Sequence, residues 1–224
     1  MRAGDPHAGQ PVLRDGPSPE DARLVAILLH GRGASAADIL GLAQQFTATN
    51  IAYLAPQASE STWYPYSFLA PLSDNEPWLG SALRLVADLV EAVGRRGVPA
   101  QRIAILGFSQ GACLALEFAA RHARRYAGVI AFTGGLIGPP ATDRSDAGDF
   151  EGTPIFIGSS DVDPHVPLAR VQESHAMLSR MGAEVDERIY PGMGHTINAD
   201  ELEAADALLR REVRGGDLPR PRTN

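Results

Sequence analysis

A serine in the middle of the chain has the surroundings of a nucleophile on a sharp turn. Ser109 is the centre of the motif Gly-Phe-Ser-Gln-Gly (residues 107–111), directly after the apolar run 103–106 and directly before the small-residue segment 112–116. A strand, a tight turn and a helix in that order lift a serine hydroxyl clear of a sheet, and the turn closes only where the flanking positions lack bulk. The first N–H groups and the dipole of the following helix favour a developing oxyanion. The motif therefore predicts Ser109 as a nucleophile.

A serine hydroxyl reacts slowly near neutral pH, so Ser109 requires a base. Where a serine sits on such an elbow the chain order is serine, acid, histidine, which leaves the histidines His122, His165, His175 and His195. His122 ends the predicted helix after the serine, and His175 lies inside another. His195 lies in the glycine-rich turn 191–196, between the last strand and the last helix, where its ring can reach over the sheet. We predict His195 as the base; the alternative is a histidine on a surface loop.

The base in turn requires a carboxylate to fix its tautomer and stabilise its charged form. The loop after the predicted strand 154–158 offers two, Asp161 and Asp163. We favour Asp163, because the ordered turn 164–167 that follows it fixes its direction, and we expect Asp161 to cap the turn or tune the local field. His165, beside this acid, is a candidate substrate contact; the alternative is a histidine that faces solvent.

An oxyanion hole requires two N–H donors, and the sequence offers one after each of two strands. One is the backbone N–H of Gln110, immediately after the nucleophile, and the other is expected from the loop after an early strand. That loop is residues 30–33, and we assign its donor to the backbone N–H of Arg32. His30 is expected to brace the loop rather than to react.

The segment 61–78 is rich in aromatic residues and is interrupted by three prolines. A long connection without regular periodicity is usually functional or disordered, and its aromatic content argues against disorder. The cluster predicts the wall of a substrate pocket, whereas any single ring could simply pin the loop to the core. The residues that we expect to contact substrate are Arg32, Trp63, Tyr64, Phe68, Trp78 and His165.

Strands and helices alternate along the chain, which predicts an α/β fold with a mostly parallel, doubly wound sheet, helices on both faces and reactive groups at the carboxyl ends of the strands. We divide the chain into an irregular N-terminal arm (1–22) with one edge strand near residues 12–13, a catalytic domain (23–214) and a flexible tail (215–224). The predicted strands are 24–29, 51–55, 103–106, 128–133, 154–158 and 183–189, and the predicted helices are 35–46, 79–96, 110–122, 166–181 and 200–214.

The composition argues against several classes of function. The 20 basic residues are scattered and are outnumbered by 27 acidic ones, for a net charge of -7, so nucleic acid is not an expected partner. Cys113 is the single cysteine, which excludes an internal disulfide and fits a reducing compartment; we interpret it as an apolar filler. No apolar run predicts a signal peptide or a membrane span, so we expect a cytoplasmic protein. No motif for a metal or a phosphate is present, and no cofactor is expected.

The motifs together resemble the phospholipase/carboxylesterase family of α/β-hydrolases, which includes bacterial carboxylesterases and acyl-protein thioesterases. The resemblance covers roughly residues 24–212 and rests on four motifs in the family's order, at residues 29–31, 107–111, 163–167 and 192–195. It implies the α/β-hydrolase fold with little or no lid and hydrolysis of carboxylic esters, or of thioesters, through an acyl-enzyme without a cofactor.

One departure from the family pattern bears on the substrate. Thioesterase relatives carry an apolar residue where Arg32 stands, with an acid soon after it, whereas here Gly33 and Ala34 follow. A cation at the mouth of the pocket fits a short or partly acidic ester better than a long acyl chain on a protein. The leading hypothesis is a serine carboxylesterase acting on a small-molecule ester. The alternatives are a C–C bond or lactone hydrolase of aromatic breakdown and a non-catalytic ligand-binding member of the fold; a homodimer is left open.

Overall fold

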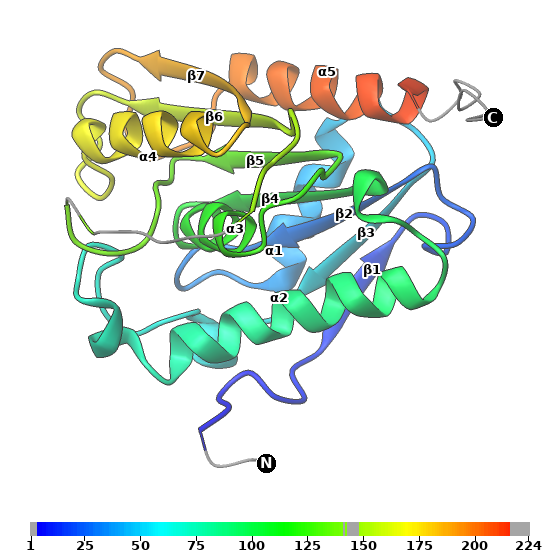
Figure 1. Cartoon of the computed structure of the whole chain (residues 1–224), viewed down its shortest axis with the longest axis horizontal. Coiled ribbons are helices and arrows are strands. Elements are labelled where there is room, and N and C mark those ends of the chain that lie inside the picture. Colours follow the sequence, from blue (N-terminus) through cyan, green and yellow to red (C-terminus); the bar gives the residue numbers. More distant parts are fainter. Residues whose placement is uncertain (1–3, 141, 143–147, 216–224) are drawn as a thin grey trace.

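The computed structural model describes residues 4–140, 142 and 148–215. They form a seven-stranded sheet with helices on both faces (Figure 1). The strand order is β1-β3-β2-β4-β5-β6-β7. Strand β1 pairs with β3 in the antiparallel sense, and every other neighbouring pair is parallel. The doubly wound, mostly parallel sheet predicted from the alternation of elements is confirmed.

Apart from the predicted helix 35–46, the element bounds follow the predicted ones closely. The strands are β1 (Val12–Asp15), β2 (Leu24–Leu29), β3 (Ile51–Pro56), β4 (Ile103–Phe108), β5 (Gly128–Phe132), β6 (Pro154–Ser160) and β7 (Glu184–Tyr190). The helices are α1 (Ala36–Leu40), α2 (Trp78–Arg95), α3 (Gln110–Arg121), α4 (Leu168–Arg180) and α5 (Ala199–Gly215). Short 3₁₀ segments are Gly41–Gln45, Ser59–Ser61, Leu72–Asn75 and Ala100–Arg102.

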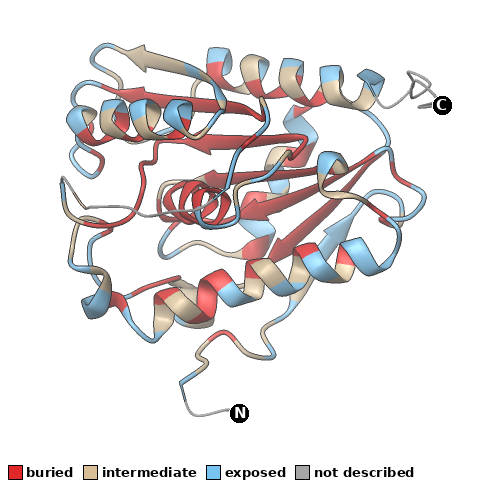
Figure 2. Cartoon of the chain, in the orientation of Figure 1, coloured by how far each residue is buried: buried red, intermediate tan, exposed pale blue. Residues whose placement is uncertain are grey.

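The apolar runs of the sequence become strands that are covered on both sides. Strands β2, β3, β5 and β6 are buried at every residue, as Figure 2 shows in red. One core cluster packs α2, α3 and α4 against one face of the sheet, and a second packs α1 and α5 against the other. Burial on both faces explains why these strands read as continuous apolar runs rather than as alternating ones.

The predicted helix 35–46 is one α-helix only in its first part. Ser35 and Asp38 form the expected capping box, but α1 ends at Leu40 and a 3₁₀ segment, Gly41–Gln45, continues the turn. Glycine has a low helix propensity, and the N–H of Gly41 is directed at three successive carbonyls as the helix tightens. The change of helix type therefore coincides with the glycine.

The N-terminal arm is tied to the domain at two places. Strand β1 lies beside β3 at one edge of the sheet, where an edge strand was expected. Further upstream, His7 is fully buried, and its backbone N–H donates to Ser81 Oγ of α2 at 3.0 Å. Of the predicted tail 215–224, Gly215 is the last residue of α5, and residues 216–224, like residues 1–3, lie outside the described residues.

Within the described ranges, no helix combines the length and the apolar character needed to cross a membrane.

Candidate active site

Ser109 occupies a strained turn between β4 and α3. Its φ of 55° and ψ of −118° lie outside the regions that a residue with a side chain ordinarily adopts. A Cβ at Gly107 would overlap the carbonyl of Gly111, and one at Gly111 would overlap the carbonyl of Leu29. The Ser109 N–H donates to the Phe132 carbonyl of β5 at 2.9 Å, which anchors the turn to the neighbouring strand. The lack of bulk predicted at both glycines is therefore a steric requirement.

Three side chains from loops after three different strands meet at the carboxyl end of the sheet. Ser109 Oγ lies 2.8 Å from His195 Nε2, and His195 Nδ1 lies 2.7 Å from Asp163 Oδ2. The carboxylate can only accept, so Nδ1 carries a proton and Nε2 is free to accept the proton of the serine hydroxyl. The arrangement can deprotonate Ser109 without moving any of the three residues.

Asp163 is held by the turn that follows it. Its Oδ1 accepts hydrogen bonds from the backbone N–H groups of His165 and Val166 at 2.7 and 2.9 Å, which leaves Oδ2 for His195. Burial by itself raises the pKa of this carboxyl, but the hydrogen bonds from His195 and from the two backbone groups outweigh it and leave the pKa below its ordinary value. The carboxylate therefore stays charged at neutral pH.

Asp161, the second candidate acid, contacts the loop that carries His195 rather than the imidazole. Its Oδ1 accepts the N–H of Gly192 at 2.7 Å. The loop after β6 thus touches the loop after β7 twice, once through the backbone at Gly192 and once through the ring of His195.

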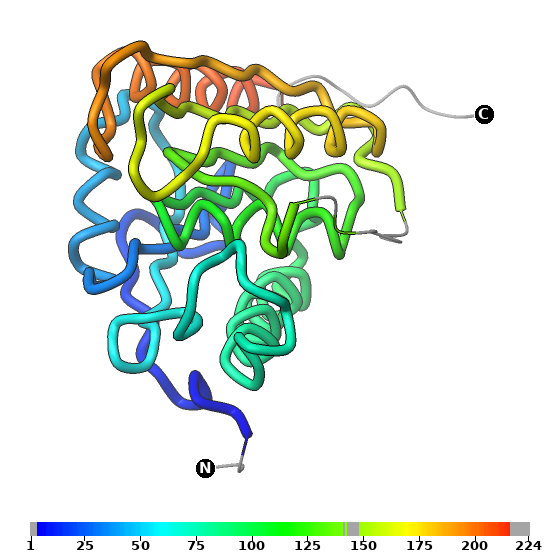
Figure 3. Tube along the Cα trace, turned by 90° about the vertical axis from the view of Figure 1, so that its left-hand side faces the viewer, coloured from blue at the N-terminus to red at the C-terminus, as the bar shows by residue number. Residues whose placement is uncertain are grey.

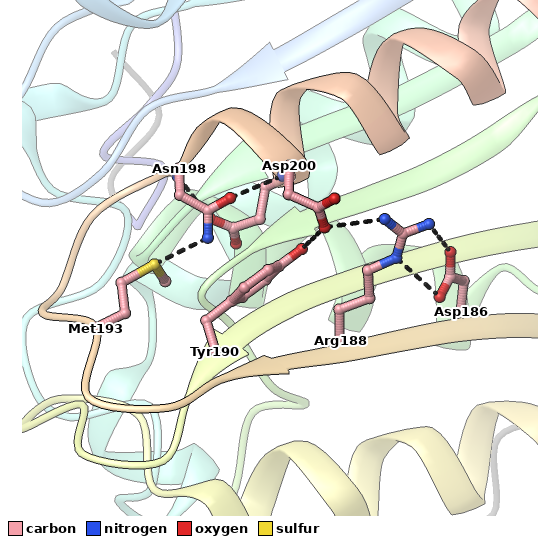
Figure 4. A network of polar contacts seen from close by, with 7 residues as sticks. Asp186, Arg188, Tyr190, Met193, Asn198 and Asp200 are labelled. Atoms are coloured by element: carbon pink, nitrogen blue, oxygen red, sulfur yellow. Dashed lines mark hydrogen bonds and ion pairs between the residues drawn. The ribbon is translucent and has the colours of Figure 1, made fainter.

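The loop that carries His195 is also tied to the start of α5 (Figure 4). Tyr190, the last residue of β7, donates its hydroxyl proton to Asp200 Oδ2 at 2.5 Å, and Arg188 donates to the same oxygen at 2.9 Å. Asn198 donates from Nδ2 to Met193 Sδ at 3.1 Å. These contacts join both ends of the segment between β7 and α5. The position of the imidazole is therefore defined by more than its hydrogen bonds to Ser109 and Asp163.

Two rings flank the His195 imidazole. The Phe108 ring lies 5.1 Å from it between centroids, and the His165 ring lies 4.8 Å from it in an edge-to-face arrangement at 73°. Phe108 is the residue before Ser109, and His165 lies two residues after Asp163. The segments that carry the two hydrogen-bond partners of His195 therefore also carry the two rings beside it. His165 lines the pocket described below, where it can contact a bound molecule.

The two predicted oxyanion donors lie on adjoining segments. Gln110 is the first residue of α3, where an N–H group has no acceptor within its own helix. The loop of Arg32 lies against the serine, since a Cβ on Gly31 would be 3.6 Å from Ser109 Cβ and 3.3 Å from the Phe108 ring. His30 braces this loop as expected: its buried ring accepts the Ala58 N–H at 3.0 Å and contacts the Gly31 carbonyl at 2.8 Å.

A pocket of about 460 Å³ opens beside Ser109 and His195. Of the expected substrate contacts, Arg32, Tyr64, Phe68 and His165 line it. Further lining residues are Pro65, Tyr66, Ser67, Gln110, Cys113 and Val166. The aromatic segment 61–78 thus does supply one wall of a pocket next to the reactive serine.

The two tryptophans of that segment do not line the pocket. Trp63 is fully buried and donates from Nε1 to the carbonyl of His30 at 2.8 Å, and Trp78 packs edge-on against the buried ring of His7. The placement of both rings against substrate, which we inferred from the density of aromatic residues, does not match this geometry.

Cys113 lies at the pocket, which the sequence did not indicate. The thiol is buried, and burial raises its pKa to about 12, so it remains protonated and unreactive at neutral pH. Burial also raises the pKa of the neighbouring Tyr64 phenol well above its ordinary value. Neither group supplies a charge to the pocket near neutral pH.

Comparison with known proteins gives one family. A family model described as Phospholipase/Carboxylesterase matches residues 16–212. The solved structure of a phospholipase/carboxylesterase from Dyadobacter fermentans is 45% identical and superposes with a TM-score of 0.87, covering 90% of this chain and 96% of that one.

Curated relatives are more distant. An acyl-protein thioesterase 1 from Eremothecium gossypii is 26% identical over 91% of this chain and 93% of its own length. One from Neurospora crassa is 34% identical, but the match spans only about half of each protein, 56% of this chain and 52% of the relative. The fold and the resemblance predicted from the four motifs are thereby confirmed.

Proposed function

The chain belongs to the phospholipase/carboxylesterase family of α/β-hydrolases and is a carboxylic ester hydrolase, and we propose that it cleaves esters of short to medium acyl chains through an acyl-enzyme on Ser109. The observation that carries the proposal is the pair of short distances from the imidazole of His195, 2.8 Å to Ser109 Oγ and 2.7 Å to Asp163 Oδ2. Such a relay activates a hydroxyl that is otherwise a weak nucleophile.

The proposed reaction begins when Ser109 Oγ attacks the ester carbonyl carbon and its proton passes to His195 Nε2. Asp163 stabilises the imidazolium, and the N–H groups of Arg32 and Gln110 donate to the oxyanion that forms. Collapse of the tetrahedral intermediate breaks the bond to the alcohol oxygen, which leaves with the proton from His195. A water that loses a proton to His195 then attacks the acyl-enzyme, and the carboxylic acid departs as Ser109 recovers its proton.

The pocket supports short to medium acyl groups. Its volume of about 460 Å³ lies in the lower part of the range for small-molecule sites, roughly 300 to 1,000 Å³. Its lining combines aromatic and aliphatic side chains with Ser109 and His195. Such a lining suits an apolar acyl chain next to a polar reacting group. A thioester has the same acyl carbon and is a substrate for the same steps.

The cation at the pocket supports a substrate with an acidic substituent. The Arg32 guanidinium donates to the carbonyls of Pro65 and Tyr66 at 2.8 and 2.7 Å, so it is held in place by neutral acceptors. Within the described ranges no carboxylate pairs with it, and its positive charge is left to attract an anionic group on a substrate.

The proposal is tested by covalent labelling and by acyl-chain preference. A fluorophosphonate probe should label the wild-type protein, and Ser109→Ala should abolish both the label and the burst of nitrophenol from a nitrophenyl ester. Ser179→Ala, at an exposed position of α4, is the matched control. Labelling that survives in Ser109→Ala would refute the nucleophile, and a chain-length series that peaks at long acyl groups would refute the proposed substrate size.

A further inference from the structure

The two proposed oxyanion donors lie just beyond the point where the pairing of their strands ends. Arg32 follows β2 and Gln110 follows β4, and the pairing between these strands ends where Leu29 faces Gly107. An oxyanion hole functions only when both N–H groups point at one position, and donors about 1 Å out of place lose much of their effect. Contacts beyond the strand ends therefore contribute to the spacing between the two loops, in addition to the packing of Gly31 against Ser109.

Trp63 makes hydrogen bonds to both loops. Its indole Nε1–H donates to the carbonyl of His30 at 2.8 Å, two residues before Arg32. Its backbone N–H donates to Gln110 Oε1 at 2.9 Å. The residue is fully buried, and its ring lies 4.9 Å from the ring of His30. One residue thus bridges the segment of the first donor and the side chain of the second.

The Gln110 side chain completes the connection. Its Nε2 donates to the carbonyl of Tyr64 at 2.8 Å while its Oε1 accepts from Trp63, so the amide pairs with the backbone of two consecutive residues. A side chain held at both of its polar atoms has little freedom to rotate. Because the Gln110 side chain is fixed, the N–H of the same residue at the start of α3 is fixed relative to Trp63.

His7 of the N-terminal arm holds Trp63 from the opposite side. Its Nδ1 accepts the N–H of Ser59 at 3.1 Å, and its Nε2 lies 3.0 Å from the carbonyl of Trp63. A backbone N–H can only donate, so Nδ1 is unprotonated and the proton is on Nε2, which donates to Trp63. In Figure 3 the arm, in dark blue, lies next to the cyan segment that contains Trp63.

We propose that Trp63 is a positioning residue that sets the spacing between the two oxyanion donors, and that His7 keeps Trp63 in place. The inference rests on the proposed acyl-enzyme reaction and adds a requirement to it. Neither residue touches substrate. Trp63 acts through the backbone of His30 and the side chain of Gln110, and His7 acts through Trp63. The effect of losing either residue falls on the transition state rather than on substrate binding.

Trp63→Phe tests the proposal, because it keeps an aromatic ring and removes the donor to His30. We expect kcat for a short nitrophenyl ester to fall about 10- to 100-fold, less than the loss of a whole oxyanion donor, with KM close to wild type. Tyr126→Phe is the matched control. It removes the hydroxyl of a fully buried ring, which donates to the backbone carbonyl of His122 at 3.0 Å and accepts from Arg124 Nε at 3.1 Å, away from the site.

A second measurement separates positioning from a loss of packing. A trifluoromethyl ketone adds to Ser109 and places an oxyanion in the hole, so its affinity should fall by the same factor as kcat/KM in Trp63→Phe. Thermal stability should fall comparably in Trp63→Phe and Tyr126→Phe. Unchanged kcat in Trp63→Phe, or inhibitor affinity that stays at the wild-type value, would overturn the proposal. An inactive, unlabelled wild type would instead refute the proposed function.

The role of His7 is tested by rescue. His7→Leu removes both ring hydrogen bonds and should lower kcat severalfold with KM unchanged. His7→Gln supplies one donor and one acceptor on a side chain of similar reach and should restore most of the loss. Equal kcat in the leucine variant and the wild type would show that the arm does not support Trp63, and a glutamine variant as impaired as the leucine variant would contradict the assigned hydrogen bonds.

Discussion

The carboxylate of Glu201 occupies the space that a side chain at Gly158 would fill. A Cβ built on Gly158, in β6, would overlap Glu201 Oε1. The other oxygen of Glu201 accepts the Asn198 N–H at 2.8 Å, and Asn198 Oδ1 accepts the Glu201 N–H at 2.9 Å, which is a reciprocal cap on α5. A buried acid therefore joins β6, which leads to Asp163, to the helix that follows the loop of His195.

Glu201 should make stability depend on pH. Burial raises the pKa of its carboxyl from about 4.5 to about 7, so the folded state binds the proton more tightly than the unfolded state does. The contribution of Glu201 to stability should be greatest below about pH 4.5, fall between there and pH 7, and be level above. Glu201→Gln removes the charge and should raise the free energy of unfolding at pH 8, by up to the order of 3 kcal/mol, with little change at pH 4.

Denaturant unfolding of both proteins across this pH range measures the effect. Glu203→Gln, an exposed change on the same helix, is the control and should leave the profile unchanged. A gain in Glu201→Gln that is the same at pH 4 and pH 8 would contradict the raised pKa.

The elbow glycines should tolerate no side chain. Gly111→Ala places a methyl group against the carbonyl of Leu29, which belongs to a buried strand and cannot move aside. We expect a loss of about 1 to 3 kcal/mol in unfolding free energy and of most esterase activity, since the shift is transmitted to Ser109. Gly94→Ala is the control. A Cβ there meets nothing within 4 Å, so the change should stabilise α2 by about 0.4 to 1 kcal/mol and leave activity intact.

The fold and the proximity of Ser109, His195 and Asp163 were predictable because local patterns specify them. The run 24–29 is apolar throughout because β2 is covered on both faces, and the glycines around Ser109 are where backbones approach within contact distance. The order of serine, acid and histidine then restricts the search, and the structure brings His195 and Asp163 together with Ser109.

The positions of individual aromatic rings were not predictable in the same way. Trp63 and Tyr64 are adjacent in an irregular segment, and no periodicity distinguishes a ring beneath the pocket from a ring that lines it. The position of Trp63 depends on residues far away in the sequence. Trp63 donates hydrogen bonds to the carbonyl of His30 and to the side-chain amide of Gln110, and His7 of the N-terminal arm contacts the carbonyl of Trp63. Cys113 lines the pocket because it lies in the first turn of α3, and Gln110, where that helix begins, also lines the pocket.

Arg32 should set a preference for anionic esters. Arg32→Gln removes the charge but keeps a side chain that can donate to one of the loop carbonyls. The comparison uses an ester that carries a free carboxylate and the same ester with that carboxylate replaced by a neutral carboxamide. We expect the substitution to lower kcat/KM for the acidic ester about tenfold more than for the neutral one, a difference of about 1.4 kcal/mol. Rates for the pair of substrates at low and high salt measure this, because the preference of the wild type should weaken as salt screens the charge.

Arg180→Gln, exposed at the end of α4, is the control. Equal losses on both substrates would mean that Arg32 only supports the loop.

Asp163→Asn should distinguish the two acids of the loop after β6. The asparagine amide can keep the N–H groups of His165 and Val166 on its oxygen, but it then directs an NH₂ at His195 and favours the tautomer that cannot accept from Ser109. We expect kcat to fall by about 10⁴, with KM and the fold retained.

Asp161→Asn is the matched comparison: its carbonyl oxygen can still accept the Gly192 N–H, so kcat should fall far less. Steady-state kinetics of the two variants decide the assignment, and a larger loss in Asp161→Asn than in Asp163→Asn would reverse it.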